Sequence, residues 1–238
     1  PDEPALCETF ITEHRAVLAD FGIPEGVAKN NSWRDDPFCF VIVVLHPELG
    51  MVGGLRLQMD NGQRRLPMEE AIISMDPRIT IELDRLREFG NGEVCGLWSA
   101  NRYPNKGVAT LISTAVTAIS TFVDAGRMVC FVASYTRKYP ARNGFVELST
   151  VGDNGVFQYP TPRIRSMAMV NPDTLLLPHC DKDQRNALYS LRLRPLQTRI
   201  ETPASVPVEV HFDLRVGRAA LQSETYTAIA DERMRWAS

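Results

Sequence analysis

Residues 101–110, NRYPNKGVAT, combine a turn, a glycine and two basic side chains directly before a long helical pattern. A glycine at a helix start lets the backbone approach a ligand, and the first N–H groups of a helix have no intrahelical acceptor. Phosphate binds to such groups, and the helix dipole favours its charge. An ordinary strand-to-helix connection is the alternative. The expected phosphate-binding residues are Arg102, Lys106, Gly107, Val108, Ala109 and Thr110.

This turn lies inside a strand, helix, strand pattern. Apolar residues recur at helical spacing from Val108 to Val123, serines and threonines occupy the opposite face, and Gly126 is the expected helix stop. Residues 93–100 precede the turn, and residues 128–135 form a nearly unbroken apolar run, as in a strand buried on both faces. The pattern predicts two parallel strands, with the phosphate turn at the carboxyl end of the first.

Composition excludes several classes of protein. The chain has 238 residues, 44% of them hydrophobic and 23% charged, which suffices for a sizeable core in a globular protein. A net charge of -3 argues against a general nucleic-acid or membrane-surface binder. No apolar run is long enough to span a bilayer, and no signal peptide opens the chain. We therefore expect a cytoplasmic protein.

Cysteine and histidine spacing predicts neither disulfides nor a metal site. The five cysteines are widely spaced, odd in number, and three lie in apolar runs, which favours buried, reduced thiols. The four histidines show no ligand spacing. We expect no metal cofactor.

The segments before the central unit predict a helix and a hairpin. Residues 9–21 have a modest apolar helical face, and residues 38–45 and 51–57 read as antiparallel strands. Residues 66–76 indicate a short helix or turn, and residues 79–89 fit a helix or a strand.

The segments after the central unit predict mainly sheet. Residues 135–145 suggest a short helix, and residues 156–170 one or two strands. Residues 188–194 and 208–216 indicate sheet, the latter alternating strictly between apolar and polar, and residues 218–236 a surface helix. With 202–207 as the candidate linker, we expect a main domain at 1–180 and a β-rich extension at 181–238. That extension would complete the chain's own sheet or form a homodimer.

This order of elements, with the turn Asn105, Lys106, Gly107, Val108 and Ala109, resembles the GNAT acyltransferase superfamily and its Gly-x-Gly/Ala coenzyme A loop. The resemblance covers roughly residues 35–175 and implies a mixed α/β (α+β) sheet flanked by helices. Pro104 stands where that loop usually has Arg or Gln, so Arg102 or Lys106 would supply the charge.

Within the superfamily, the chain looks like the acyl-homoserine-lactone (autoinducer) synthases and the related N-acyl amino acid synthases. Arg56 and Leu57 fit their Gly-x-x-Arg-Leu strand end. Glu93 fits the first position of their Glu-x-x-Arg-Leu strand, in which Gly96 here replaces the arginine.

The resemblance implies roles for individual residues. A substrate amine would attack an acyl thioester whose carbonyl is polarised by a backbone N–H near Leu97 or Trp98. Glu93 would take the proton of the amine, and Tyr139, with Tyr135 as competitor, would protonate the leaving thiolate. Arg56 would hold a substrate carboxylate. A surface or packing role is the alternative for each of these side chains.

The expected function is therefore N-acyl transfer from acyl-CoA or an acyl carrier protein to the amine of an amino-acid-like small molecule. A carrier protein would bind to Arg102, Lys106, Arg137, Lys138 and Arg142. An acetyl-CoA N-acetyltransferase with a shallow acyl pocket and a catalytically silent GNAT-like binding protein are the rival hypotheses.

Overall fold

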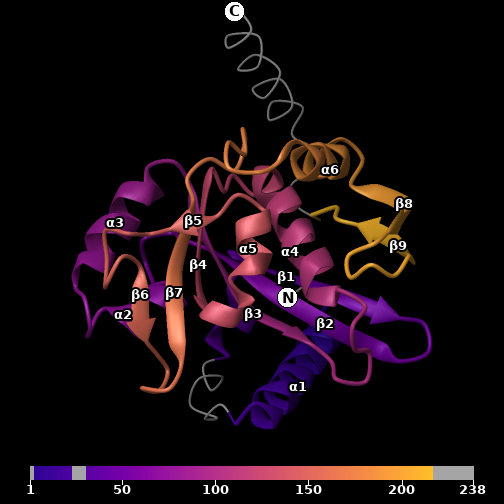
Figure 1. Cartoon of the computed structure of the whole chain (residues 1–238), viewed down its shortest axis with the longest axis horizontal. Helices are drawn as coiled ribbons and strands as arrows, with labels where there is room; N and C mark the ends of the chain where they lie inside the picture. Colours follow the sequence, from indigo (N-terminus) through magenta and orange to yellow (C-terminus); the bar gives the residue numbers. More distant parts are fainter. Residues whose placement is uncertain (1–2, 23–30, 217–238) are drawn as a thin grey trace, which may run out of the picture.

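A mixed β-sheet with helices on both faces forms the centre of the molecule (Figure 1). The structure, a computed structural model, describes residues 3–22 and 31–216. In the strand order β1-β2-β3-β4-β7-β5, with β6 also on β7, every neighbouring pair is antiparallel except β3 and β4. The strands are β1 (Cys39–His46), β2 (Gly50–Met59), β3 (Asn91–Ser99), β4 (Arg127–Ala133), β5 (Val146–Glu147), β6 (Val156–Gln158) and β7 (Arg165–Asn171).

Helices pack on both faces of this sheet. Two adjacent glycines of β2 show how closely: a Cβ on Gly53 would meet Val108 and Ile112 of α4, whereas one on Gly54 would meet Phe10 of α1. Thus α1 and α4 lie on opposite faces. The helical segments before α6 are α1 (Pro4–Asp20), η2 (Ser32–Asp35), α2 (Pro67–Ile72), α3 (Arg78–Arg87), α4 (Val108–Ile119), η3 (Ser120–Phe122), η4 (Ser134–Thr136) and α5 (Lys138–Arg142).

Most local predictions are confirmed, and the ambiguous segment 79–89 forms helix α3 as far as Arg87. The central helix differs in two respects. It ends at Ile119, and the chain turns at Asp124, which has φ 56°, rather than stopping at Gly126. Its serine and threonine face is buried too, because α6 covers it; the Gln184 amide, for example, donates to Thr114 Oγ1 at 3.1 Å.

The prediction for residues 188–194 was wrong, because they lie mostly in helix α6 (Lys182–Leu193). The buried face of α6 explains this: Leu188 and Leu191 are fully buried on the same side as Gln184, at helical rather than strand spacing. Arg192 fixes the helix against α4, donating to the carbonyls of Thr117 and Thr174 at 3.0 and 2.7 Å. Thr117 lies in the last turn of α4 and Thr174 follows β7. Carbonyls at such places have no partner within their own helix or strand and need a donor from elsewhere in the chain.

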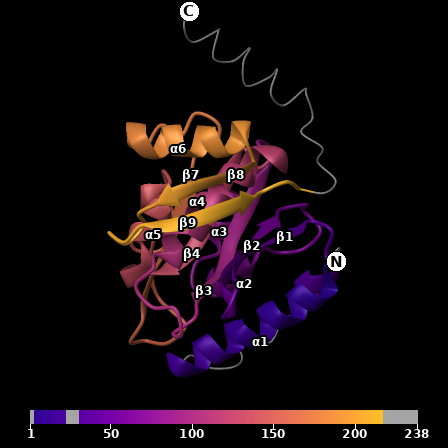
Figure 2. The same cartoon turned by 90° about the vertical axis from the view of Figure 1, so that its right-hand side faces the viewer.

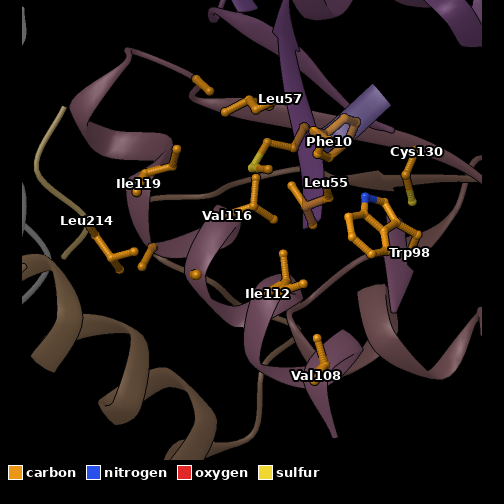
Figure 3. Close-up of a cluster of buried hydrophobic side chains, with 14 of the residues drawn as sticks. Phe10, Leu55, Leu57, Trp98, Val108, Ile112, Val116, Ile119, Cys130 and Leu214 are labelled. Carbon is orange, nitrogen blue, oxygen red and sulfur yellow. The ribbon is translucent and has the colours of Figure 1, made fainter. Parts of the chain in front are cut away.

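The alternating strand is β9 (Val208–Asp213), and it pairs with β8 (Leu196–Glu201) in a separate two-stranded sheet. Figure 2 shows this hairpin in front of α4 and beneath α6. Phe212 and Leu214 join the apolar cluster that contains Ile119 and Val116 (Figure 3). The supposed linker, 202–207, is the β8–β9 loop. The helix expected at 218–236 lies outside the described residues.

All five cysteines are free; Cys7, Cys130 and Cys180 are buried as predicted, whereas Cys39 and Cys95 are half-buried. Among residues 3–22 and 31–216, no helix combines the length and apolar character needed to cross a bilayer.

Candidate functional site

The parallel strands β3 and β4 pair over only four residues and then part. Pairing runs from Asn91 with Arg127 to Val94 with Cys130, although β3 continues to Ser99 and β4 to Ala133. On its other edge β3 remains paired with β2 as far as Ser99. Beyond Val94 and Cys130 the facing backbone groups of the two strands therefore have no partner in each other. We call this place the fork.

Glu93 lies on β3, one residue before Val94, where the pairing with β4 ends and the fork begins. Its side chain is buried, and its Oε2 accepts the backbone N–H of Met68 at 2.7 Å. Burial raises the pKa of Glu93 to about 8; Arg56 lowers that pKa and Glu70 raises it. A carboxyl group with this pKa can exchange a proton near neutral pH, as a general base must.

Arg56 lies on β2, opposite Cys95 of β3 and therefore on the same face as Glu93. Its guanidinium carbon is 4.6 Å from the centre of the Trp33 ring, a cation–π contact. Its Nε is buried, and no hydrogen-bond acceptor reaches it within the part of the chain that the structure describes. Such a buried donor is rare in proteins, which makes Arg56 Nε a candidate donor to a substrate oxygen.

Gly96 lies between Glu93 and Trp98 in an irregularity of the β2–β3 pairing. Its φ is +63°, a left-handed conformation in which a side chain is strained, so arginine would fit poorly here. A Cβ would lie 3.4 Å from Arg56 Nε and 3.6 Å from His14 Cε1. The glycine therefore leaves the space beside Arg56 to groups from α1.

Sequence reasoning missed these aromatic and imidazole groups. Phe10 contacts His14, Trp33 and Trp98, with ring centres 5.6–5.9 Å apart. Burial, with a smaller effect of Arg56, lowers the pKa of His14 to about 4, so the imidazole is neutral at physiological pH. The i, i+4 spacing of Phe10 and His14 on a predicted helix is the signal that would have paired them.

The turn predicted to bind phosphate leads into a helix, as expected. Gly107 precedes α4 with φ 69°, and its carbonyl accepts the N–H groups of Thr110 and Leu111 at 3.0 and 3.1 Å. The N–H groups of Val108 and Ala109 come before the first hydrogen bonds of the helix. Such N–H groups are the ones that bind anions at a helix start. Pro203 of the β8–β9 loop covers the α-carbon of Gly107, where an added Cβ would be 2.5 Å from the proline Cβ.

The two basic residues of the turn have different surroundings. The Arg102 guanidinium donates to both carboxylate oxygens of Glu13 and to the carbonyls of Leu49 and Met51. It thus joins the turn to α1 and the β1–β2 hairpin. Lys106 has no ion pair among the described residues and lines a groove of about 1990 Å³ between β1, α4, α6 and β9. Of the two, Lys106 is the side chain available to a phosphate.

Leu97 and Trp98 lie on β3 beyond the last pair with β4, so the structure brings both to the fork. The Trp98 side chain is 3% exposed, and its indole N–H has no acceptor in the described chain. Figure 3 shows the indole nitrogen turned towards Phe10 and Leu55.

The predicted tyrosines lie on a different element. Tyr139 is half-buried in α5 with the Lys138 ammonium 5.2 Å from its ring centre, and Tyr135 is 66% exposed in η4. Neither forms a hydrogen bond with Glu93 within the described ranges. The structure thus places Arg56 where its charge acts on Glu93, and packs Trp98 against Phe10, but it does not join Tyr139 to these residues.

The expected carrier-protein patch is partly engaged within the chain. Arg137 pairs with Glu147, and the Arg142 Nε donates to Gln184 at 2.9 Å. Lys106 and Lys138 form no ion pair in the part of the chain described. No group of three potential metal ligands occurs in residues 3–22 and 31–216.

Comparisons with known proteins support the fold. No protein-family model and no curated protein sequence matches this chain. A solved structure of FeeM, an N-acyl amino acid synthase from uncultured soil microbes, matches 71% of this chain and 90% of its own, with TM-score 0.52 and 16% identity. MesI, a CoA-dependent acyl-homoserine lactone synthase, matches 79% of this chain and 87% of its own, with TM-score 0.51 and 12% identity. The chain therefore has a GNAT-like fold, a mixed sheet flanked by helices, which it shares with these two synthases.

Proposed function

We propose that the protein is an N-acyltransferase that moves an acyl group from a thioester, on coenzyme A or a carrier protein, to an amino-acid-like amine. The observation that carries this proposal is the buried Glu93, with its raised pKa, directly at the fork between β3 and β4. The similarity to FeeM and MesI is consistent with it.

The fork provides a place for the amide-containing arm of the donor. Unpaired backbone groups beyond Val94 and Cys130 supply the donors and acceptors that such an arm needs, much as an added strand would. The donor's phosphates would lie on the N–H groups at the start of α4 and beside Lys106. A β3 backbone N–H at Leu97 or Trp98 would stabilise the negative charge that develops on the thioester oxygen.

Glu93 would take one proton from the substrate ammonium, leaving a neutral amine. The amine nitrogen attacks the thioester carbon, the C–N bond forms, and the C–S bond breaks. The sulfur leaves as a thiolate and takes a proton, for which the phenol of Tyr139 is the candidate source. The nitrogen then loses a second proton, which returns to the phenolate and restores the phenol. One proton passes from Glu93 to water, which balances the reaction.

Arg56 is the candidate ligand of the acceptor's carboxylate. Its buried Nε has no acceptor in the described chain, and the Trp98 indole N–H shares that property. Both groups are hydrogen-bond donors without acceptor atoms. Trp98 contacts Phe10 directly, and Arg56 packs on Trp33, which contacts Phe10 in turn. A carboxylate would satisfy donors that otherwise cost about 1–3 kcal/mol each when buried unpaired.

The donor is tested by melting temperature during titration with coenzyme A and with acetyl-, octanoyl- and palmitoyl-CoA, because ligands of the folded state raise it. Lys106→Ala should weaken the stabilisation by every thioester, whereas the control Lys182→Ala, which removes an exposed lysine from α6, should not. A shift that grows with chain length supports a long-chain synthase, and one equal for acetyl- and palmitoyl-CoA supports an acetyltransferase. No shift with any thioester contradicts the use of acyl-CoA.

A further inference from the structure

Helix α1 is fastened to the turn that leads into α4. The Glu13 carboxylate accepts the Arg102 guanidinium on both oxygens, from Nη1 at 2.8 Å and from Nη2 at 3.0 Å. At the end of α1, the Asp20 carboxylate accepts the side-chain amide of Asn101 at 2.8 Å. Asn101 and Arg102 begin the turn that ends at Gly107. Two carboxylates of one helix therefore hold the start of the proposed phosphate site.

The Arg102 guanidinium is engaged within the chain. Besides the two bonds to Glu13, its Nε donates to the Leu49 carbonyl at 3.3 Å and its Nη2 to the Met51 carbonyl. A guanidinium has five N–H donors, and these contacts use four of them. A bidentate arginine–carboxylate pair also fixes the relative orientation of its two partners. Arg102 thus holds the turn, the β1–β2 hairpin and α1 in one arrangement.

The same helix lines the space beside Arg56. Phe10 packs on Trp33 with ring centres 5.6 Å apart, and the Arg56 guanidinium carbon is 4.6 Å from the centre of the Trp33 ring. The point that a Cβ on Gly96 would occupy lies 3.6 Å from His14 Cε1 and 3.4 Å from Arg56 Nε. Helix α1 thus contributes two side chains to the surroundings of the proposed carboxylate ligand.

Glu13 and His14 are consecutive residues of one helix, so the contact with the turn and the contact beside Arg56 lie next to each other. Backbone hydrogen bonds within a helix make its residues move together. The packing of α1 on the sheet is also tight: a Cβ on Gly54 would lie 2.7 Å from Phe10 Cε2. The turn therefore cannot shift without breaking the Glu13 pair or moving α1.

We propose that α1 couples the two substrates, with Glu13 and Arg102 as the positioning residues that connect the donor turn to the acceptor side. Donor phosphates at the start of α4 would fix the turn, and the turn would fix α1 through the Glu13 pair. An acceptor that binds Arg56 beside α1 then has fewer groups to order and binds more tightly. By linkage, the acceptor strengthens donor binding by the same factor. This inference rests on the proposed function and makes its two sites interdependent.

The test compares the affinity of an amino acid for the complete chain with and without saturating coenzyme A. Each common amino acid is first screened by melting temperature in the presence of coenzyme A. Isothermal titration calorimetry then gives the affinity of the amino acid that stabilises the protein most. We expect coenzyme A to raise this affinity about fivefold or more in the wild type, as is typical of coupled sites.

Two variants assign the coupling to α1. Glu13→Gln should lower the factor to about two or less, because a neutral amide holds a guanidinium less firmly than a carboxylate does. Asn101→Ala, which removes the second contact with α1, should lower it by a smaller amount. The affinity for the amino acid alone should stay the same in both variants. A merely structural role of Glu13 would instead weaken both affinities and leave their ratio unchanged.

The variants should keep the fold, because the Glu13–Arg102 pair is partly exposed and such pairs contribute little to stability. The control Glu88→Gln removes an exposed carboxylate directly after α3 and should keep the wild-type factor.

Three results would overturn the coupling: equal amino-acid affinity with and without coenzyme A in the wild type, no binding of any amino acid, or an undiminished factor in Glu13→Gln. Coenzyme A binding reports on the proposed function separately. A wild type that binds coenzyme A and an amino acid independently refutes the coupling and leaves the proposed function standing. A wild type that binds no coenzyme A contradicts the proposed donor, and the coupling with it.

Discussion

The pH dependence of stability tests the environment of Glu93 without any assumption about substrates. The perturbation is Glu93→Gln, which keeps the shape of the side chain and an oxygen that can accept the Met68 N–H. Wild-type Glu93 has a pKa of about 8 in the folded protein because of burial, against an ordinary value of 4.5. Between these values the folded state holds a proton that the unfolded state has lost.

The sign follows from linkage. A carboxyl group whose pKa is raised by folding stabilises the folded state least when it is ionised, so stability falls as the pH rises through the folded-state pKa. At 1.36 kcal/mol per pH unit of full protonation difference, the wild type should lose about 3 kcal/mol between about pH 6 and about pH 9. The glutamine variant lacks this contribution.

The assay is urea unfolding of both proteins at several pH values in that range. The difference in unfolding free energy between the two proteins should be smaller at about pH 6 than at about pH 9, because stability is lost progressively between the unfolded-state pKa of 4.5 and the folded-state pKa of about 8. At about pH 9 the variant should be more stable than the wild type, with Glu88→Gln as the control for loss of one charge. Parallel pH profiles of wild type and Glu93→Gln would refute the proposed burial and raised pKa.

Further predictions concern the turn, the α4–α6 contact and the acceptor. Gly107→Ala should lower the free energy of unfolding by about 1–3 kcal/mol, because the backbone is left-handed and Pro203 lies against it; an unchanged urea midpoint would contradict this. Arg192→Met should cost about 3 kcal/mol through unpaired carbonyls at Thr117 and Thr174, also visible in urea unfolding. Arg56→Lys should raise the KM of the acceptor about tenfold and leave the KM of the thioester unchanged; equal changes in both would argue against carboxylate binding. Glu70→Gln should move the rise of kcat/KM to lower pH, because the Glu70 charge raises the pKa of Glu93.

Local patterns predicted the elements that hold the site. The apolar periodicity before and after Gly107 is a property of neighbouring residues, so the strand, helix, strand unit with a glycine at the start of its helix could be predicted from the sequence. The same is true of the alternation in β9, whose Phe212 is buried while His211 is exposed.

Side-chain directions and contacts between segments far apart in the chain could not be predicted from the sequence. The charge of Arg102 was evident, but its partner Glu13 lies 89 positions earlier in the chain. The buried Ser and Thr face of α4 depends on α6, which contributes Gln184 and Arg192 from far along the sequence. Tyr159 is brought to Phe131 only because β6 pairs with β7 and β7 pairs with β4, and no local pattern reveals it.

The most direct test of the account is the pH dependence of kcat/KM for N-acyl product formation by wild type and Glu93→Gln. Product is measured by mass spectrometry, with the acyl-CoA and the amino acid that stabilise the protein most. We predict that wild-type kcat/KM rises with pH through about 8, as Glu93 ionises, and that the variant loses about 10²–10⁴-fold. Equal activity of the two proteins, or the same pH profile in both, would contradict the role of Glu93 as the base.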